Sequence, residues 1–444
     1  MRSLRLAALL LAAFPVTASA ATTAFSGPAL GPVPVEFILF GLVLLGVAVS
    51  HLHTLRIALT GAVVIALYKS FVSSFETGAG AGAFALHVEQ EWVILTNLLM
   101  LLVGFALLAK HFEESKVPAV LPRFLPDDWT GCLVLLVLVF VLASFLDNIA
   151  AAMIGGAIAH TVFRRKVHIG YLAAIVAASN AGGAGSVVGD TTTTMMWIAG
   201  VPPTEVLHAF IGSAAALAIF GIPASVLQQR YSPIQRDETP DARIDWIRVG
   251  VVGSILAAAV IVNVTINTRF TEVSDRFPFL GAAVWVALLV TVGVRKPDWS
   301  LMPNALKGSV FLLSLVLCAS MMPVDKLPDA SWHAAFGLGF TSAVFDNIPL
   351  TALALKQGGY DWGFLAYVVG FGGSMIWFGS SAGVALSNMY PEAKDARQWI
   401  RHGWFVSAAY VVGFVVMLGV MGFHPGTTPR TAPPAAAEHL TVLR

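Results

Sequence analysis

Two short segments, far apart in the chain, read almost alike and place an acid beside an amide inside apolar sequence. Ser144–Ile149 reads Ser-Phe-Leu-Asp-Asn-Ile, and Ala343–Ile348 reads Ala-Val-Phe-Asp-Asn-Ile. A charged side chain at the centre of a bilayer costs roughly 2.5–3.5 kcal/mol even on the mildest scale, so an acid in such a place is expected to be functional. A matched pair, one in each half of the chain, predicts a duplicated fold with a duplicated site.

The composition is that of an integral membrane protein. Of the 444 residues, 57% are apolar and 11% are charged, whereas soluble domains carry about 25% charged residues. The formal net charge of +1 gives no reason to expect nucleic acid as a partner, so membrane lipid is the expected environment. The two cysteines form neither a disulfide framework nor a metal-binding motif, and no cofactor is expected.

Residues 1–20 have the pattern of a secretory signal peptide. Arg2 and Arg5 form a basic start, residues 6–14 are apolar, and Ala18-Ser19-Ala20 is a small-residue cleavage site. An uncleaved first helix is the alternative. Cleavage would place the mature N-terminus outside the cytoplasm.

Apolar segments of spanning length fall into two sets of five, separated by a polar linker at residues 228–246. We expect a first repeat over 33–227, a second over 247–423, and a disordered tail over 424–444. Because five is an odd number, the second repeat must enter the membrane upside down, which is the topology of inverted-repeat secondary transporters. The segments are 33–50, 54–70, 91–109, 168–200 and 205–227, then 247–266, 279–294, 305–322, 361–388 and 403–423.

The two Asp-Asn segments do not fit as simple spans. Residues 130–146 and 149–163 are apolar pieces of about 15–17 residues, and helices of that length reach about 22–26 Å, short of a hydrocarbon core near 30 Å. Residues 332–345 and 349–357 are shorter still. We therefore expect an all-α fold in which each repeat contains a re-entrant helical hairpin with Asp-Asn at its tip. Such irregular backbone survives at membrane depth where protein or a wet cavity surrounds it.

An excess of lysine and arginine at one set of segment ends assigns that side to the cytoplasm, as at residues 164–166 and 295–296. With this orientation the chain is predicted to cross the bacterial inner (cytoplasmic) membrane several times, with a periplasmic mature N-terminus and C-terminus. The first hairpin then opens to the cytoplasm and the second to the periplasm.

Each hairpin is followed by a glycine cluster with the same spacing. Glycines in the middle of a span break the helix and free backbone carbonyls, which coordinate cations in broken helices. The alternative is that they only allow helices to pack closely. Asp190 follows the first cluster where Ser380 follows the second, so the half-sites are not equivalent. The clusters are Gly182, Gly183 and Gly189, and Gly372, Gly373 and Gly379.

The polar residues at the hairpin tips and glycine clusters form the candidate ion-binding and proton-binding site. Hard oxygen donors with net negative charge suit a small hard cation. A carboxylate in a low-dielectric environment also holds a proton more readily, so H⁺ and Na⁺ compete for the same groups, as an antiporter requires. Na⁺ is expected at Asp147, Asp190 and Asp346. The full candidate set is Asp147, Asn148, Asn180, Gly182, Gly183, Asp190, Thr191, Asp346, Asn347, Gly372, Gly373, Ser380 and Ser381.

Three motifs carry a resemblance to a known family: Phe-Leu-Asp-Asn-Ile, Asn-Ala-Gly-Gly-Ala with Gly-Asp-Thr-Thr-Thr-Thr-Met-Met-Trp, and Phe-Asp-Asn-Ile-Pro-Leu-Thr. Over residues 140–200 and 340–390 the chain resembles the NhaD-type sodium/proton antiporters. Their superfamily includes arsenite pumps and citrate and dicarboxylate carriers. The resemblance implies a scaffold and a transport domain, exchange of Na⁺ or Li⁺ for H⁺, and Asp147, Asp190 and Asp346 as the ion-handling acids. It also implies that the chain can form a homodimer.

Two other functions fit parts of the sequence. A sodium-coupled carrier of citrate, dicarboxylate or another oxyanion would use the same broken helices. The dicarboxylate carriers have Ser-Asn-Thr at their hairpin tips, whereas both tips here carry Asp, which favours cation exchange. Gly379-Ser380-Ser381-Ala382-Gly383 matches the Gly-x-Ser-x-Gly motif of serine hydrolases. That motif requires a strand–turn–helix, which this apolar segment does not predict, so an enzyme is not expected.

Overall fold

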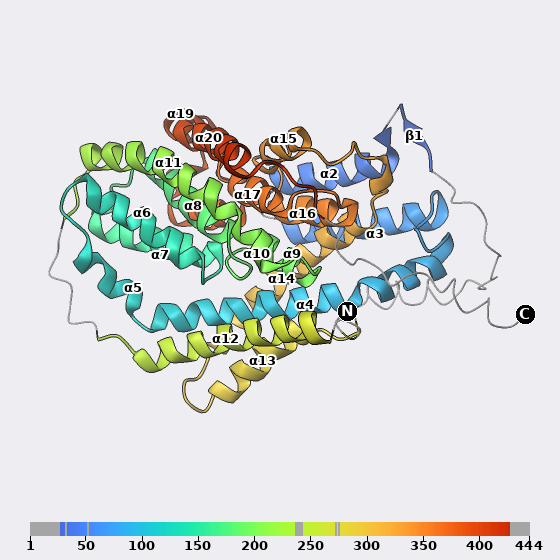
Figure 1. Ribbon diagram of the computed structural model, residues 1–444, viewed down its shortest axis with the longest axis horizontal. Coiled ribbons are helices and arrows are strands. Elements are labelled where there is room, and N and C mark those ends of the chain that lie inside the picture. The colour runs from blue at the N-terminus through green and yellow to red at the C-terminus, as the bar shows by residue number, and fades with distance from the viewer. Residues whose placement is uncertain are drawn as a thin grey trace, which may run out of the picture.

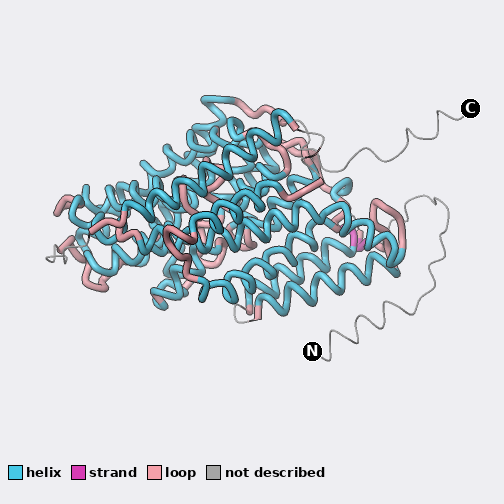
Figure 2. Tube along the Cα trace, turned by 90° about the horizontal axis from the view of Figure 1, so that it is seen from below, coloured by secondary structure: helices cyan, strands magenta, loops and turns pink. Residues whose placement is uncertain are grey.

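The computed structural model describes residues 27–31, 33–50, 53–235, 243–270, 273 and 276–426. Nearly all regular structure within them is helical (Figures 1 and 2), which confirms the expected all-α class. A short antiparallel pair, β1 (Ala29–Leu30) with β2 (Val33–Pro34), precedes the helices. The predicted signal peptide lies outside the described residues, as do residues 236–242 of the linker and 427–444 of the tail.

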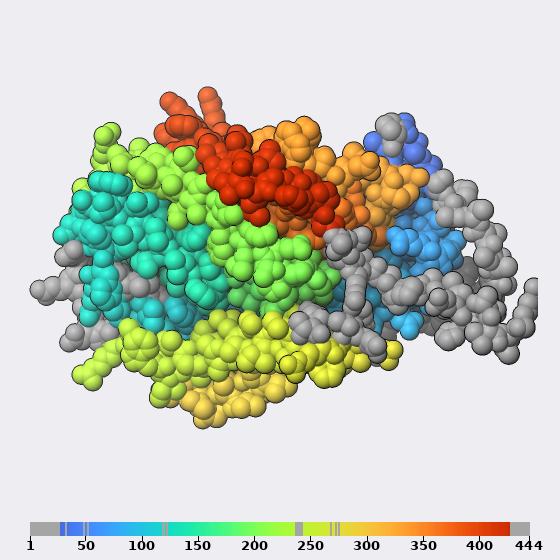
Figure 3. Space-filling model, in the orientation of Figure 1, coloured from blue at the N-terminus to red at the C-terminus, as the bar shows by residue number. Residues whose placement is uncertain are grey.

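Six helices pack together as a group that we call the scaffold group. In Figure 1, α4, α12 and α13 of this group lie along the lower side of the molecule, and Figure 3 shows α12 and α13 forming the lower edge of the surface. Contacts of α4 with α13, of α12 with α13 and of α14 with α3 hold the group together. Its members are α2 (Val35–Val49), α3 (Thr54–Phe71), α4 (Gly80–Glu114), α12 (Trp246–Arg269), α13 (Phe279–Thr291) and α14 (Met302–Ser320).

The other long helices form a second group, the site group, in the upper part of Figure 1. Its first set is α6 (Trp129–Ala143), α7 (Asn148–Val162), α8 (Ile169–Ala184), α9 (Thr191–Ile198), α10 (Pro203–Leu207) and α11 (Ala209–Tyr231). Its second set is α15 (Trp332–Ser342), α16 (Asn347–Gln357), α17 (Trp362–Gly372), α18 (Ser381–Met389), α19 (Ala396–His402) and α20 (Trp404–Met421). Short turns α5 (Val117–Val120), η1 (Leu121–Phe124), η2 (Trp299–Leu301), η3 (Val324–Lys326) and η4 (Pro391–Lys394) connect the elements.

The order of elements is the same in both halves of the chain. Each half contributes three scaffold helices, then a helical pair joined at Asp-Asn, a helix interrupted after Gly-Gly, and a long final helix. Contacts repeat in the same way, because α4 packs on α13 as α14 packs on α3, and α6 packs on α8 as α15 packs on α17. The second arm of each pair also packs on the interrupted helix of the other half, α7 on α18 and α16 on α9.

Helices α8 and α17 form the centre of the core. Every residue from Gly170 to Ala184 and from Trp362 to Gly372 is buried. A helix that is apolar around its whole circumference is stable only when other helices surround it. Helices α6, α7 and α11 pack around α8, and α15, α11 and α20 pack around α17. The interrupted helices are therefore held inside protein, where polar groups at their breaks can find protein partners.

Six helices among the described residues are long and apolar enough to cross a membrane, and the chain is a multi-pass membrane protein. The other apolar helices are shorter, including α2 with 15 residues and α13 with 13. The interrupted helices divide into pieces of 16 and 8 residues, and of 11 and 9. The six candidate spans are Thr54–Phe71, Gly80–Glu114, Pro203–Tyr231, Trp246–Ile266, Trp299–Ser320 and Trp404–Met421.

Candidate functional site

Hydrogen bonds link four helix N-termini around one site. The capping side chain at each N-terminus belongs to a candidate site residue. Asp147 caps α7, accepting a hydrogen bond from the Ile149 N–H at 2.8 Å, and Asp346 caps α16 through the Ile348 N–H at 3.0 Å. Asp190 caps α9 through the Thr192 N–H at 2.9 Å. Asp and Ser are preferred caps because a side-chain oxygen satisfies an N–H that has no partner within the helix.

The fourth cap is Ser380, at the start of α18, whose hydroxyl oxygen accepts from the Gly383 N–H at 3.3 Å. Ser380 holds the position in the second half that Asp190 holds in the first. The predicted inequivalence of the two half-sites is thus an inequivalence of two helix caps. Three caps are carboxylates and one is a neutral hydroxyl.

Two buried asparagines join the caps across the two halves. The Asn148 amide donates to the Asn180 side-chain oxygen and to the Asp190 carboxylate, both at 3.0 Å. The Asn180 amide donates in turn to the hydroxyls of Ser374 at 2.9 Å and Ser380 at 3.0 Å. Asn148 is 5% exposed and Asn180 and Ser374 are fully buried, so these bonds replace water as their partners.

Asp346 lies at the far side of this network. Its second carboxylate oxygen accepts from the Ser381 hydroxyl at 3.4 Å. Asn347, the first residue of α16, is buried. The structure therefore places the second Asp-Asn tip against α18, as the first tip lies against α9 through Asn148.

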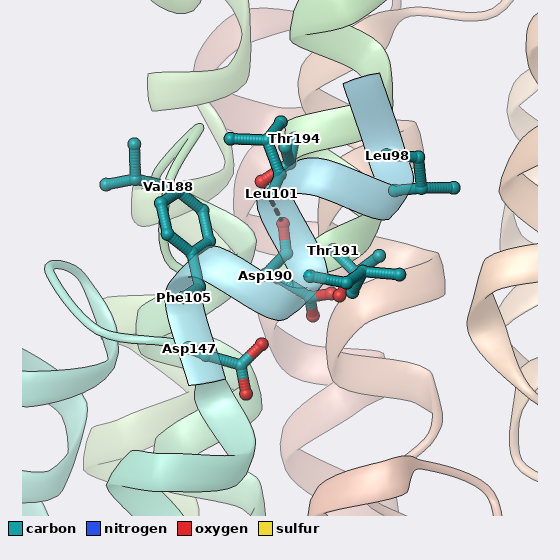
Figure 4. A pocket seen from close by; sticks show the side chains of 9 residues that line it. Leu98, Leu101, Phe105, Asp147, Val188, Asp190, Thr191 and Thr194 are labelled. Atoms are coloured by element: carbon teal, nitrogen blue, oxygen red, sulfur yellow. Dashed lines mark hydrogen bonds between the residues drawn. The ribbon is translucent and has the colours of Figure 1, made fainter. Parts of the chain in front are cut away.

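A small pocket lies between the site group and helix α4. Its polar side consists of Asp147, Asp190, Thr191 and Thr194. Figure 4 shows the carboxylates of Asp147 and Asp190 facing the same space. No lysine or arginine is among the described residues that line it. The opposite side is apolar and consists of Leu98, Leu101, Leu102 and Phe105 of α4, with Val188 beside them.

The three acids do not surround one point. Among the described residues, no group of three His, Cys, Asp or Glu side chains is close enough to hold one metal ion. Asp147 and Asp190 share the pocket, whereas Asp346 is not part of its lining. Coordination of Na⁺ at all three acids remains a prediction, and the shared pocket favours the Asp147–Asp190 pair.

The paired glycines allow very close packing of backbone against backbone. A Cβ added to Gly182 would lie 2.0 Å from the Phe140 carbonyl oxygen, and one added to Gly372 would lie 2.5 Å from that of Gly339. A Cβ added to Gly183 would lie 2.7 Å from the Gly189 carbonyl oxygen, and one added to Gly373 would lie 2.7 Å from that of Gly379. Gly182 and Gly372 therefore allow each interrupted helix to pack closely on the hairpin of its own half. Cation binding by the carbonyls of these glycines remains a prediction.

Sequence reasoning missed Ser374 and the apolar wall of the pocket. Ser374 directly follows the Gly372-Gly373 pair, and its polar side chain inside an apolar segment of the sequence was the available signal. The wall residues Leu98, Leu101 and Phe105 carry no such signal, because a leucine that faces a pocket looks the same in sequence as one that faces lipid.

Comparison with known proteins gives relatives of one kind. No family model matches the chain. Sodium/proton antiporter 1 of Arabidopsis thaliana is 27% identical over 326 residues, which are 64% of this chain and 54% of that protein. The Na⁺/H⁺ antiporter NhaD of Vibrio cholerae is 25% identical over 293 residues, 56% of this chain and 61% of that protein. The chain is similar to the NhaD-type sodium/proton antiporters. NhaD of Halomonas elongata is likewise 25% identical, over 64% of this chain.

The chain spans about half the length of the first Arabidopsis relative and 61% of the Vibrio cholerae NhaD. The resemblance expected from the Asp-Asn and Gly-Asp-Thr motifs is confirmed.

Replacing Gly182 with Ala is expected to destabilise the protein by about 1–3 kcal/mol, because the added methyl group overlaps the Phe140 carbonyl and forces two helices apart. The measurement is the melting temperature of the purified protein in detergent. Gly337→Ala is the matched control, since a Cβ there meets no atom within 4 Å and alanine favours the helix. A Gly182→Ala protein that melts at the wild-type temperature would contradict the close packing.

Replacing Asn180 with Ala is expected to lower the free energy of unfolding by roughly 1–3 kcal/mol, because the buried Asn148 amide loses an acceptor and Ser374 and Ser380 lose a donor. Thermal melting measures the change. Thr161→Ala is the control, since that exposed hydroxyl bonds only to its own helix and should change stability by less than about 0.5 kcal/mol. Equal melting of both variants would show that the network contributes nothing.

Proposed function

We propose that this protein exchanges Na⁺ or Li⁺ for H⁺ across the membrane by alternating access. The observation that carries the proposal is the pocket that Asp147 and Asp190 line together, with Thr191 and Thr194 beside them. Carboxylate and hydroxyl oxygens are the ligands that small hard cations prefer. Water-poor surroundings favour the neutral acid when Na⁺ is absent, so proton loss and cation binding are coupled.

The helix N-termini explain why a cation is favoured over an oxyanion. An uncapped N-terminus attracts an anion, and four of them together would suit a citrate or dicarboxylate group. Here the chain's own carboxylates already cap α7, α9 and α16. They neutralise the positive helix ends and leave net negative charge facing the pocket. The relatives named above are sodium/proton antiporters, and the oxyanion carrier is not favoured.

We further propose that the repeats are inverted, with residues 33–227 and 247–423 as the two units, 228–246 as a cytoplasmic linker and 424–444 as a disordered tail. The repeated element order and the paired contacts of α4 with α13 and α14 with α3 support this arrangement. The proposed location is the bacterial inner membrane, with the signal peptide removed and both mature termini periplasmic. Its partners are lipid, small cations and a second copy of the chain, with no cofactor and no enzymatic step.

The proposal is tested in everted membrane vesicles that carry a pH-sensitive fluorescent dye. Adding Na⁺ or Li⁺ should restore the quenched fluorescence, and Asp147→Asn or Asp190→Asn should abolish this response. Removing one partner of a buried charged interaction costs about 3–5 kcal/mol, more than about a hundredfold in affinity. Asp329→Asn, at an exposed loop position, is the matched control and should leave exchange unchanged.

Two results would contradict the proposal. One is an absence of dye response to Na⁺ and Li⁺ together with Na⁺-dependent citrate uptake. The other is full exchange by both Asp147→Asn and Asp190→Asn proteins at wild-type expression.

A further inference from the structure

The two hairpins dock unequally on the scaffold group. Helix α16 of the second hairpin packs along α14, whereas α7, its counterpart in the first hairpin, makes only sparse contact with α4. The pocket with Asp147 is lined on its α4 side by Leu98, Leu101, Leu102 and Phe105. If the two halves were arranged alike, both hairpins would dock to the same extent. The two hairpins therefore differ in how closely they pack on their scaffold helices. Such a difference is what the proposed alternating access needs.

One face of the second hairpin makes the docking contact. Phe345, Ala352 and Leu353 pack against a buried apolar cluster formed by α2, α3 and α14, which includes Leu315 and Cys318. Residues three and four apart share a helix face, so this stripe continues to residue 356, one turn beyond Ala352 and Leu353. The residue at that position is a lysine.

Lys356 reaches the C-terminal end of α14. Its ammonium group donates to the carbonyl oxygens of Ser320 at 2.5 Å and Met322 at 3.0 Å, and it lies 3.0 Å from the Glu76 carboxylate. The last carbonyls of a helix have no partner within the helix and carry its negative dipole end, so a cation is favoured there. Glu76 is 74% exposed, so its ion pair adds little, and the carbonyls account for most of the attraction.

A second lysine caps the same helix end from within the scaffold group. Lys69 of α3 donates to the Met321 carbonyl at 2.7 Å and is 5% exposed. Three successive carbonyls of one helix end are therefore taken by two lysines. One of them belongs to the scaffold group and the other to a hairpin.

The first hairpin lacks this contact. Alignment of Asp147 with Asp346 places Ala157 opposite Lys356, and Ala157 is exposed on α7. The hairpin that makes the lysine contact is therefore also the hairpin that packs more extensively on its scaffold helix.

We propose that Lys356 is a positioning residue that holds the second hairpin, and with it Asp346, against the end of α14, and that it must leave these carbonyls whenever the hairpin moves. The movement rests on the proposed exchange, whereas the docking does not. A lysine suits the role because its compact charge on a flexible stem can move from the carbonyls into water. Its side chain is 18% exposed, so it already lies at the edge of the solvent.

The contact can be made permanent in the unmodified protein. A water-soluble carbodiimide joins a lysine amine and a carboxylate in direct contact, and the Lys356–Glu76 pair meets that condition with an exposed Glu76. Mass spectrometry should find this cross-link, and exchange in reconstituted vesicles should fall in proportion to the cross-linked fraction while the melting temperature does not fall. Glu76→Gln is the matched control: treated in the same way, it should form no such link and keep its exchange activity.

Three results would overturn the proposal: no Lys356–Glu76 link, undiminished exchange by cross-linked protein, or equal inhibition of the Glu76→Gln control. If untreated wild-type protein shows no exchange, the proposed function fails, and acetylation of native lysines then decides the docking. A docked Lys356 should react at least about tenfold more slowly than exposed Lys326, because its ammonium group is held by two carbonyl oxygens. Exposed Lys326 is the internal standard for the reagent. Equal reactivity of Lys356 and Lys326 would show that the docking contact is not made.

Discussion

The structure depends on the hydrogen bond between a carboxylate in apolar surroundings and the first turn of a helix. Apolar surroundings exclude an isolated charge, but a helix N-terminus offers unpaired N–H groups and the positive end of a dipole. Asp147, Asp190 and Asp346 each use one carboxylate oxygen in this way. The cap fixes where each carboxylate lies, and it makes an acid tolerable at the centre of an apolar fold. The helix breaks at residues 147, 190 and 346 place these N-termini inside the fold.

Asymmetry between the halves follows from a few substitutions within a common plan. Asp190 and Ser380 cap equivalent helices, yet only one brings charge to the pocket. Lys356 and Ala157 occupy equivalent places on the hairpins, and only the hairpin with lysine docks along its scaffold helix. In the proposed transport cycle, two nearly equivalent halves that differ at such points exchange conformations.

Much of this site could be predicted because its motifs occur in both halves of the chain. The Asp-Asn tips and the Gly-Gly-x₅-Gly clusters stand out by repetition and by polarity within apolar sequence, and the breaks at residues 147 and 346 fall where expected. The hydrogen bonds that join the caps could not be predicted, because Asn180 meets Ser374 and Ser380 across 194 and 200 residues of chain. Nor could the separation of Asp346 from the pocket, or the α4 wall, since both depend on how helices pack in space and not on their order in the chain.

The central claim is that a proton and Na⁺ compete for the carboxylates at these helix ends. Its most direct test is proton release from the purified protein in weakly buffered detergent solution, followed with a pH indicator while NaCl is added. The account predicts acidification with NaCl but not with choline chloride. It predicts a lower Na⁺ affinity at lower pH, because protons then occupy the acids. It also predicts no proton release from an Asp147→Asn, Asp190→Asn double variant. Na⁺ binding detected by calorimetry without any proton release would contradict it.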